Sequence, residues 1–246
     1  MKFIQLSQFW PYLALFLALL AWRVLAQYRA VHWVLKSLKA RVVLEGSSWS
    51  YVEARLASLA YERRLPRPAL YVLPEFSPNA MAMRGRNSSI YITLSEGLLQ
   101  VLTQRELDAV LLLLLAQASF RDAARAPRLS YYLAPLCSAL DKLPRIFWFM
   151  LSPIFSGFVR VYLRPARVYK ADRRAVNWSP SPDLAQTLQK LASLLRKVPM
   201  RRWNLAYDHL FLLSPMQIES SGIPFVTSHP PITQRLRRLL EQGLTH

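Results

Sequence analysis

ELDAVLLLLLAQASFRD, the stretch from Glu106 to Asp122, decides the fold of this chain. Thr103 and Glu106 stand three residues apart just before an apolar run, which is the spacing of a capping box. This spacing predicts a helix that opens at Thr103 and runs to about Arg121. Ala109 to Ala116 are apolar on every side. Because a helix of that kind is buried all round, we expect it at the centre of the core.

Shorter elements surround this helix in the sequence. A run with β-branched and aromatic content predicts each of two strands, Ala69–Leu73 and Ser89–Leu94, with a Pro/Asn/Gly loop between them. Ser50 and Glu53 have the spacing of a capping box, and apolar residues recur at helical spacing behind them. The patterns therefore predict further helices at Ser50–Arg64, Asp183–Val198 and Pro231–Gln242.

Length and charge limit the classes of protein to consider. With 246 residues, the chain has room for one domain plus membrane-associated elements. Lys and Arg number 32 against 14 acidic residues, which gives a formal charge of +18 and favours contact with anionic surfaces. Cys137 is the single cysteine, so no intrachain disulfide can form. No Cys/His pair has zinc-finger spacing.

The amino terminus carries the pattern of a membrane anchor. Phe9 to Ala26 is apolar apart from Arg23 and, counted from Phe3, approaches the ~20 residues that cross a bilayer. A cleaved signal peptide needs a basic start and a small-residue cleavage site, whereas aromatic residues stand at both ends here. We expect an anchor at 1–28 and the main domain at 29–246. Basic residues follow the run, so the positive-inside rule predicts a cytoplasmic domain on the inner cell membrane.

A second apolar region, Leu129 to Leu163, is interrupted by charged residues and Pro144. Each half is shorter than a standard membrane span, and the turn carries Lys142 and Arg145, which disfavour translocation. We expect a membrane-associated helical hairpin at 129–163 that dips into the leaflet. A buried hairpin in a soluble core is the alternative, because short apolar runs are ambiguous.

Several segments in a fixed order resemble the HtpX-like family of membrane zinc metallopeptidases, to which the CAAX prenyl proteases are related. These segments are the loop SPNAMAM, the strand IYITLSEGLL, the helix quoted above, RPARVYKADRRA and HLFLLSPMQIESSGIPFVTSHPPITQRLRRL. The resemblance implies that the last segment begins with a Leu-Phe strand. The resemblance covers about Leu70 to Leu240. It implies an α+β fold: a mainly helical, zincin-type metallopeptidase-like domain with a small β-sheet, beside the transmembrane helix and the hairpin.

The family's helix carries HExxH, in which two His bind zinc and the Glu acts as general base. The resemblance places Leu113-Leu114-Leu115-Ala116-Gln117 at this motif. It places Val168 at the third ligand, while the Asp of that segment is kept as Asp172. Zinc needs N, S or carboxylate ligands. The resemblance therefore implies a degenerate site with no catalytic residue, no metal and no cofactor.

These substitutions lead to the prediction of a non-catalytic pseudopeptidase, a membrane-anchored scaffold or regulatory subunit rather than an enzyme. Other membrane protein subunits are its expected partners, with anionic lipid as a further candidate and no nucleic acid. A peptidase subunit with an unconventional metal site, or one that works with an active paralogue, is the alternative. The basic residues near Arg201 and Arg237 lead to a third hypothesis, nucleic-acid binding, but no nucleic-acid-binding module accompanies them.

A partner-binding surface is predicted where the family's cleft would lie. Asn79 and Ala80 match the family's cleft edge, and Tyr91 and Ile92 belong to a strand, Ser88–Leu94, that we expect at the sheet edge. Phe149 in the hairpin completes the set. Simpler interpretations exist for four polar residues. Asn79 can be a turn residue, Asp122 can form a helix-end salt bridge, and His209 and His229 can have structural roles.

Overall fold

The computed structural model of the chain describes residues 10–44, 46–140, 142, 145–179, 183–201, 205–216 and 229–243. Four strands form one mixed sheet in the order β1-β2-β4-β3. Their bounds are β1 (Arg41–Val42), β2 (Ala69–Leu73), β3 (Ala80–Arg84) and β4 (Ile90–Ser95). β4 pairs in parallel with β2 and antiparallel with β3, so β4 is an interior strand and β3 is an edge strand.

The helices are described by the following bounds: α1 (Trp10–Ser37), α2 (Ser50–Glu62), η2 (Arg86–Ser88), α3 (Glu96–Val101), α4 (Gln104–Ser119), η3 (Arg121–Ala124), α5 (Arg125–Leu140), α6 (Arg145–Leu163), α7 (Ala166–Trp178), α8 (Asp183–Lys197), η4 (Asp208–Leu210) and α10 (Ile232–Gly243). The chain is thus mostly helical with a small mixed sheet, as the sequence predicted.

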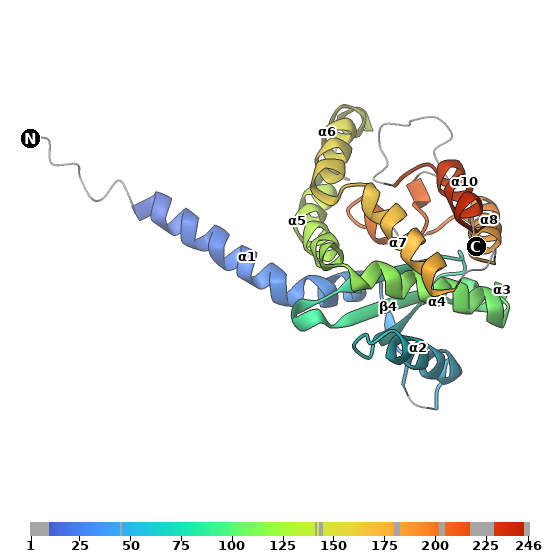
Figure 1. Cartoon of the computed structure of the whole chain (residues 1–246). Coiled ribbons are helices and arrows are strands. Elements are labelled where there is room, and N and C mark those ends of the chain that lie inside the picture. Colours follow the sequence, from blue (N-terminus) through green and yellow to red (C-terminus); the bar gives the residue numbers. More distant parts are fainter. Residues whose placement is uncertain are drawn as a thin grey trace, which may run out of the picture.

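α4 lies at the centre of the core. Every residue from Val110 to Ala116 is buried, and the helix lies between the strands β3 and β4 and the helices α7 and α8 (Figure 1). Thr103 caps it: its hydroxyl accepts from the Glu106 amide, and the Glu106 carboxylate accepts from the Thr103 amide at 2.8 Å. The predicted capping box and the predicted burial are both confirmed.

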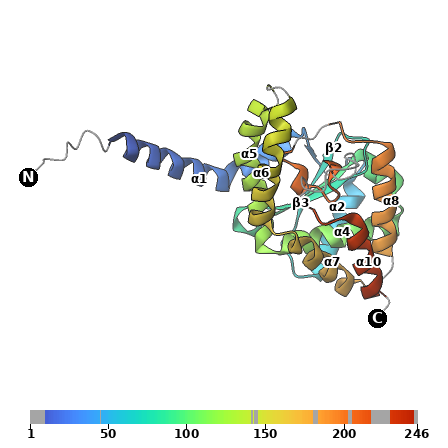
Figure 2. The same ribbon diagram turned by 90° about the horizontal axis from the view of Figure 1, so that it is seen from above.

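α1 projects from the domain in both views (Figures 1 and 2). Among the described residues it is the helix long and apolar enough to cross a bilayer. Its residues from Trp10 to Leu25 are exposed, and burial begins at Ala26. The helix continues past the expected boundary at residue 28 and ends at Ser37, because Val31, Val34 and Leu35 pack into the domain core.

α5 and α6 lie side by side near the base of α1 (Figures 1 and 2). They correspond to the two apolar stretches predicted between residues 129 and 163. Large apolar side chains on α6 are exposed: Met150, Ile154, Phe158 and Val161. One face of this hairpin is therefore left without protein contacts among the described residues.

Three local expectations are wrong. The SPNAMAM segment was expected as a loop, but its last residues form β3 because they complete the ladder beside β4. Ser50 does not cap α2; the cap position is Trp49 with no side-chain bond, and Glu53 pairs with Arg67 instead at 3.1 Å. The expected Leu-Phe strand is η4 followed by one bridge, Met81 to Phe211.

Candidate functional site

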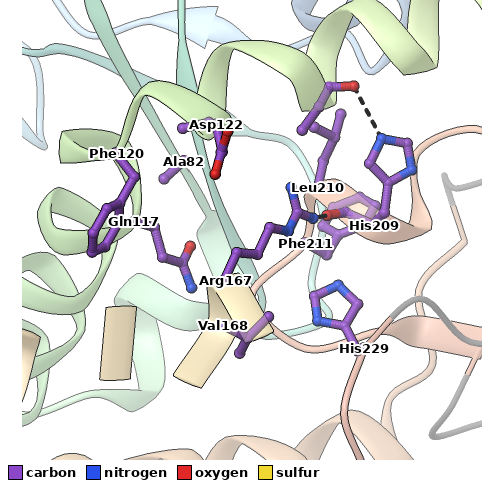
Figure 3. A pocket seen from close by; sticks show the side chains of 12 residues that line it. Ala82, Gln117, Phe120, Asp122, Arg167, Val168, His209, Leu210, Phe211 and His229 are labelled. Carbon is purple, nitrogen blue, oxygen red and sulfur yellow. Dashed lines mark hydrogen bonds between the residues drawn. The ribbon is translucent and has the colours of Figure 1, made fainter. Parts of the chain in front are cut away.

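A small cavity of about 40 Å³ lies beside the edge strand, where the end of α4 meets η3, α7 and the segment around η4 (Figure 3). Gln117 comes from α4, Arg167 and Val168 from the start of α7, and His229 from the segment before α10. Room for one water needs roughly 10–15 Å³ by the same measure. The cavity therefore holds a few waters or one small polar group.

The structure brings together two of the four positions aligned with the family's zinc site. Gln117 and Val168 both line the cavity. Leu113 and Leu114 have no exposed surface and belong to the hydrophobic core. The α4 residues N-terminal to Gln117 thus pack as an ordinary buried helix and open no face to the cavity.

The side chains at these four positions do not fit zinc. Two leucines and a valine carry no donor atom, and a glutamine amide is a weak substitute for imidazole or carboxylate. Among the described residues, no three His, Cys, Asp or Glu lie close enough together to hold a metal ion. The four positions together therefore supply at most one weak ligand.

Arg167 supplies the positive charge of the cavity. Its Nη2 donates to the His209 carbonyl at 2.7 Å. Burial lowers the pKa of the guanidinium to about 10, while the nearby charge of Asp122 raises it. The side chain therefore remains charged at neutral pH and can donate to an acceptor placed in the cavity.

His209 is held as a neutral imidazole at the back of the cavity. Its Nε2 lies 3.0 Å from the Ala126 carbonyl and 3.2 Å from the Ser130 hydroxyl, so the proton resides on Nε2. Nδ1 has no hydrogen-bond partner among the described residues. Burial, then the charge of Arg167, lowers the pKa of His209 to about 3.

His229 presents a free nitrogen to the same space. The ring donates to the backbone of Asp208, and because Nε2 is buried without a partner among the described residues, this bond comes from Nδ1. Nε2 then carries a lone pair. Burial, followed by the charges of Arg167 and Arg235, lowers the pKa of His229 well below its usual value.

Two aspartates kept from the family pattern have structural roles. Asp172 is buried and forms a two-point ion pair with Arg235, at 2.7 and 2.8 Å. This pair joins α7 to α10 behind Val168. Asp122 is exposed at the cavity rim and lies 3.3 Å from Arg125, the helix-end contact expected from its position.

The predicted partner surface is largely buried. Asn79 is 1% exposed and Ala80 is 2% exposed. The Asn79 amide donates to the Leu213 carbonyl at 2.8 Å, and its oxygen accepts from the Leu213 and Ala80 amides. Asn79 therefore fastens the segment after η4 to β3, which is a structural role and leaves nothing for a partner.

The strand expected at the sheet edge is also misplaced. Ser88–Leu94 contains most of β4, which has β2 on one side and β3 on the other, so no added strand can pair with it. Ile92 has no exposed surface, while Tyr91 is partly exposed and contacts His32. The side chain of Phe149 lies outside the described residues.

Sequence reasoning missed Arg167 and underrated His229. The signal was present in RPARVYKAD, where Arg167 precedes the aligned ligand position, and in His-Pro-Pro before a predicted helix. Both residues line the cavity in the structure. Their burial depends on contacts between segments far apart in the chain, which residue spacing does not reveal.

Comparison with known proteins decides the family. No family model matches the chain. The protease HtpX homolog of Syntrophobacter fumaroxidans is 31% identical over 204 residues, which cover 74% of this chain and 72% of the relative. The chain belongs to the HtpX protease family. The HtpX homolog of Methanocaldococcus jannaschii is 26% identical, covering 94% of this chain and 88% of the relative.

This membership overturns the functional expectation drawn from the four aligned positions. The chain was expected to be a non-catalytic scaffold or regulatory subunit and not an enzyme. That expectation is wrong, because HtpX relatives at 26–31% identity are named proteases. Replacement of the aligned residues bears only on zinc binding at those positions.

A solved structure supports the fold. The crystal structure of S. mikatae Ste24p matches with a TM-score of 0.54 at 17% identity, covering 93% of this chain and 57% of that one. The chain thus spans little more than half the length of that protein. At this identity the likeness shows the fold alone: a mostly helical chain with a small mixed sheet and an apolar amino-terminal helix.

Proposed function

We propose that the chain is a membrane-bound peptidase that works on polypeptides, with a peptide group of the substrate entering the cavity beside β3. The observation that carries this proposal is that a hydrogen-bond donor and a hydrogen-bond acceptor both line the cavity of about 40 Å³. Arg167 offers N–H groups, and His229 offers the lone pair of Nε2. A peptide group has one acceptor and one donor, and it matches this arrangement.

The edge strand β3 supports the same proposal. Phe211 and Leu212 bridge the first half of β3, and the Leu212 amide donates to the Ala80 carbonyl at 2.6 Å. Ala82 follows and lines the cavity. An extended substrate that continues the bridge past Ala82 would place its backbone over the cavity, in the manner of strand addition.

Hydrolysis at this place uses the cavity's own groups, because the four aligned side chains do not fit zinc. As a water attacks the carbonyl carbon, His229 Nε2 leaves the peptide N–H and accepts the proton of the water. It then passes that proton to the amide nitrogen, which departs as the amine when the C–N bond breaks. Arg167 can donate to the carbonyl oxygen as negative charge develops on it. Gln117 lies on the α4 side of the same space (Figure 3), where it can orient the peptide group.

A cleavage assay on the full chain tests the proposal. The purified protein in detergent is incubated with an unfolded polypeptide, and fragments are measured by mass spectrometry with and without chelator. Cleavage is expected to survive the chelator. His229→Asn should lower the rate by about a hundredfold or more, the usual contribution of a general base. His32→Asn, at an exposed His outside the cavity, is the matched control and should not change it.

Absence of fragments from the wild-type chain would overturn the proposal. So would cleavage that the chelator abolishes, because it would place a metal where the aligned side chains supply no ligands. Cleavage that is equally fast in His229→Asn would reject the cavity as the site of reaction.

The finer membrane topology belongs to the same proposal. The main domain faces the cytoplasm at the inner membrane, as the basic residues after the anchor indicate. The exposed apolar face of α6, which includes Ile154 and Val161, lies in the leaflet beside α1. Other membrane protein subunits are candidate partners at this face.

A further inference from the structure

A second hollow lies at the foot of α1, where the helix enters the domain. It has its own lining residues but shares the segment from η3 to the start of α5 with the cavity. Its volume is about 200 Å³. Ala26, Gln27 and Ala30 of α1 form one wall, and the turn after β3 and the start of α5 form the others. An adjoining hollow of about 160 Å³ shares Gln27 and Arg86 with it.

The position along α1 places this hollow at headgroup depth. The exposed apolar surface of α1 ends at Leu25, and the hollow begins at Ala26. Trp22 and Tyr28 are both exposed on the neighbouring turns. Trp and Tyr are enriched at the membrane–water interface. The rings of Trp22 and Tyr28 therefore also indicate that the hollow lies at headgroup depth.

Three arginines from three elements line the hollow: Arg84, Arg86 and Arg128. Arg84 is held by two carbonyls at the end of α4, those of Ala118 at 3.2 Å and Ser119 at 2.8 Å. Each arginine keeps guanidinium nitrogens without a hydrogen-bond partner among the described residues. No Asp or Glu lines the hollow.

The other two arginines are also held in place. Arg128 donates from Nε to the Ala124 carbonyl at 2.8 Å, which leaves its two terminal nitrogens for a ligand. Arg86 stacks over the Tyr28 ring at 4.1 Å from the ring centre. None of the three makes a salt bridge within the described part of the chain, so their positive charge is uncompensated there.

We propose that this hollow binds the phosphate headgroup of an anionic phospholipid. Guanidinium groups bind phosphate through paired N–H donors, and basic pockets beside transmembrane helices on the cytoplasmic side hold lipid headgroups. The acyl chains then lie along the exposed apolar side chains of α1 above the hollow, such as Trp22 and Leu25. This second contact favours a lipid over free phosphate.

Native mass spectrometry of the full chain in neutral detergent tests this site. Phosphatidylglycerol and phosphatidylcholine are added in equal amounts, and retained lipid is measured. Phosphatidylglycerol should be retained more tightly by about tenfold or more, since each arginine near a charged lipid contributes about fivefold. Arg86→Gln with Arg128→Gln should remove most of this preference, and glycerol phosphate in excess should not displace the lipid.

The matched control is Arg237→Gln with Arg238→Gln on α10, which removes the same charge far from α1 in both views (Figures 1 and 2). It should keep the preference. Arg86→Gln alone tests the site in a chain that keeps the Arg128 bond, and it should weaken retention about fivefold. Equal retention of the two lipids, equal loss in the α10 control, or displacement by glycerol phosphate would each overturn the proposal.

Discussion

At the scale of single residues, buried polar side chains join segments of this domain that lie far apart in the chain. Asp172 and Arg235 are the clearest case, because both are almost wholly buried and each satisfies the other. Arg235 also donates to the Leu212 carbonyl at 2.9 Å. One pair thus connects α7, α10 and the segment that bridges β3.

Replacing one partner of this pair should destabilise the fold. Arg235→Leu leaves the Asp172 carboxylate buried without a partner, which costs about 3–5 kcal/mol of unfolding free energy. The double variant Asp172→Leu with Arg235→Leu removes both charges and should recover most of that loss. Denaturant unfolding of the full chain in detergent measures both. A double variant no more stable than Arg235→Leu would contradict this account.

His209 predicts how stability depends on pH. The native ring stays neutral down to its pKa of about 3, whereas the unfolded chain binds a proton below about 6.5. Stability is therefore full above about pH 6.5 and falls by about 1.4 kcal/mol per pH unit as pH drops towards 3. Carboxylates titrate in the same interval, so the comparison is with His209→Asn. The unfolding free energy of this variant should fall by about 1.4 kcal/mol less per pH unit than that of the wild-type chain. Equal slopes would show that His209 does not stay neutral.

At the scale of elements, local patterns predicted the helices better than the sheet edge. The capping box at Thr103 and the apolar run after it fix α4, and helical spacing fixes the buried face of α8. β3 was missed because AMAMR lacks β-branched and aromatic residues. Its pairing with β4 and its bridge to Phe211 create a strand that propensity does not encode.

The cavity was predictable only in part for the same reason. The resemblance gave Gln117 and Val168 as the second and third zinc-ligand positions, and both line the cavity. Arg167 and His229 are held in the cavity by burial and by hydrogen bonds to the His209 and Asp208 backbones. Those contacts join residues separated by tens of positions, which no local pattern reports.

Asn79 should control the bridge between β3 and the segment after η4. Asn79→Ala removes the side-chain bonds to both backbone groups of Leu213, and each lost bond in a buried place costs about 1–3 kcal/mol. Amide hydrogen exchange should therefore accelerate at Leu212 and Leu213. The β4 amides that face β2, such as that of Ile92, serve as internal controls. Unchanged exchange at Leu213 would rule out this role.

At the scale of the whole molecule, one continuous helix connects the membrane to the core. α1 passes from exposed apolar residues to Val34, which has no exposed surface. α5, which packs against α1, contributes Ala126 to the cavity and Arg128 to the hollow at the foot of α1.

The orientation of this attachment is testable with an introduced thiol. Tyr61 is 85% exposed on α2, and Cys137 is buried, so Tyr61→Cys adds one accessible thiol. An impermeant maleimide added outside intact cells should not label it, and the same reagent should label it after the cells are opened. Labelling in intact cells would place the domain outside and would contradict the basic-residue argument.

Photocrosslinking to a polypeptide substrate tests the central claim most directly. A benzophenone amino acid replaces Phe120, which lines the cavity, or Tyr91, which lies on β4 outside it. The full chain is irradiated with an unfolded polypeptide, and the attached peptides are sequenced. The account predicts capture from position 120 and none from position 91. Capture from position 91 alone, or from neither position while the chain is folded, would contradict it.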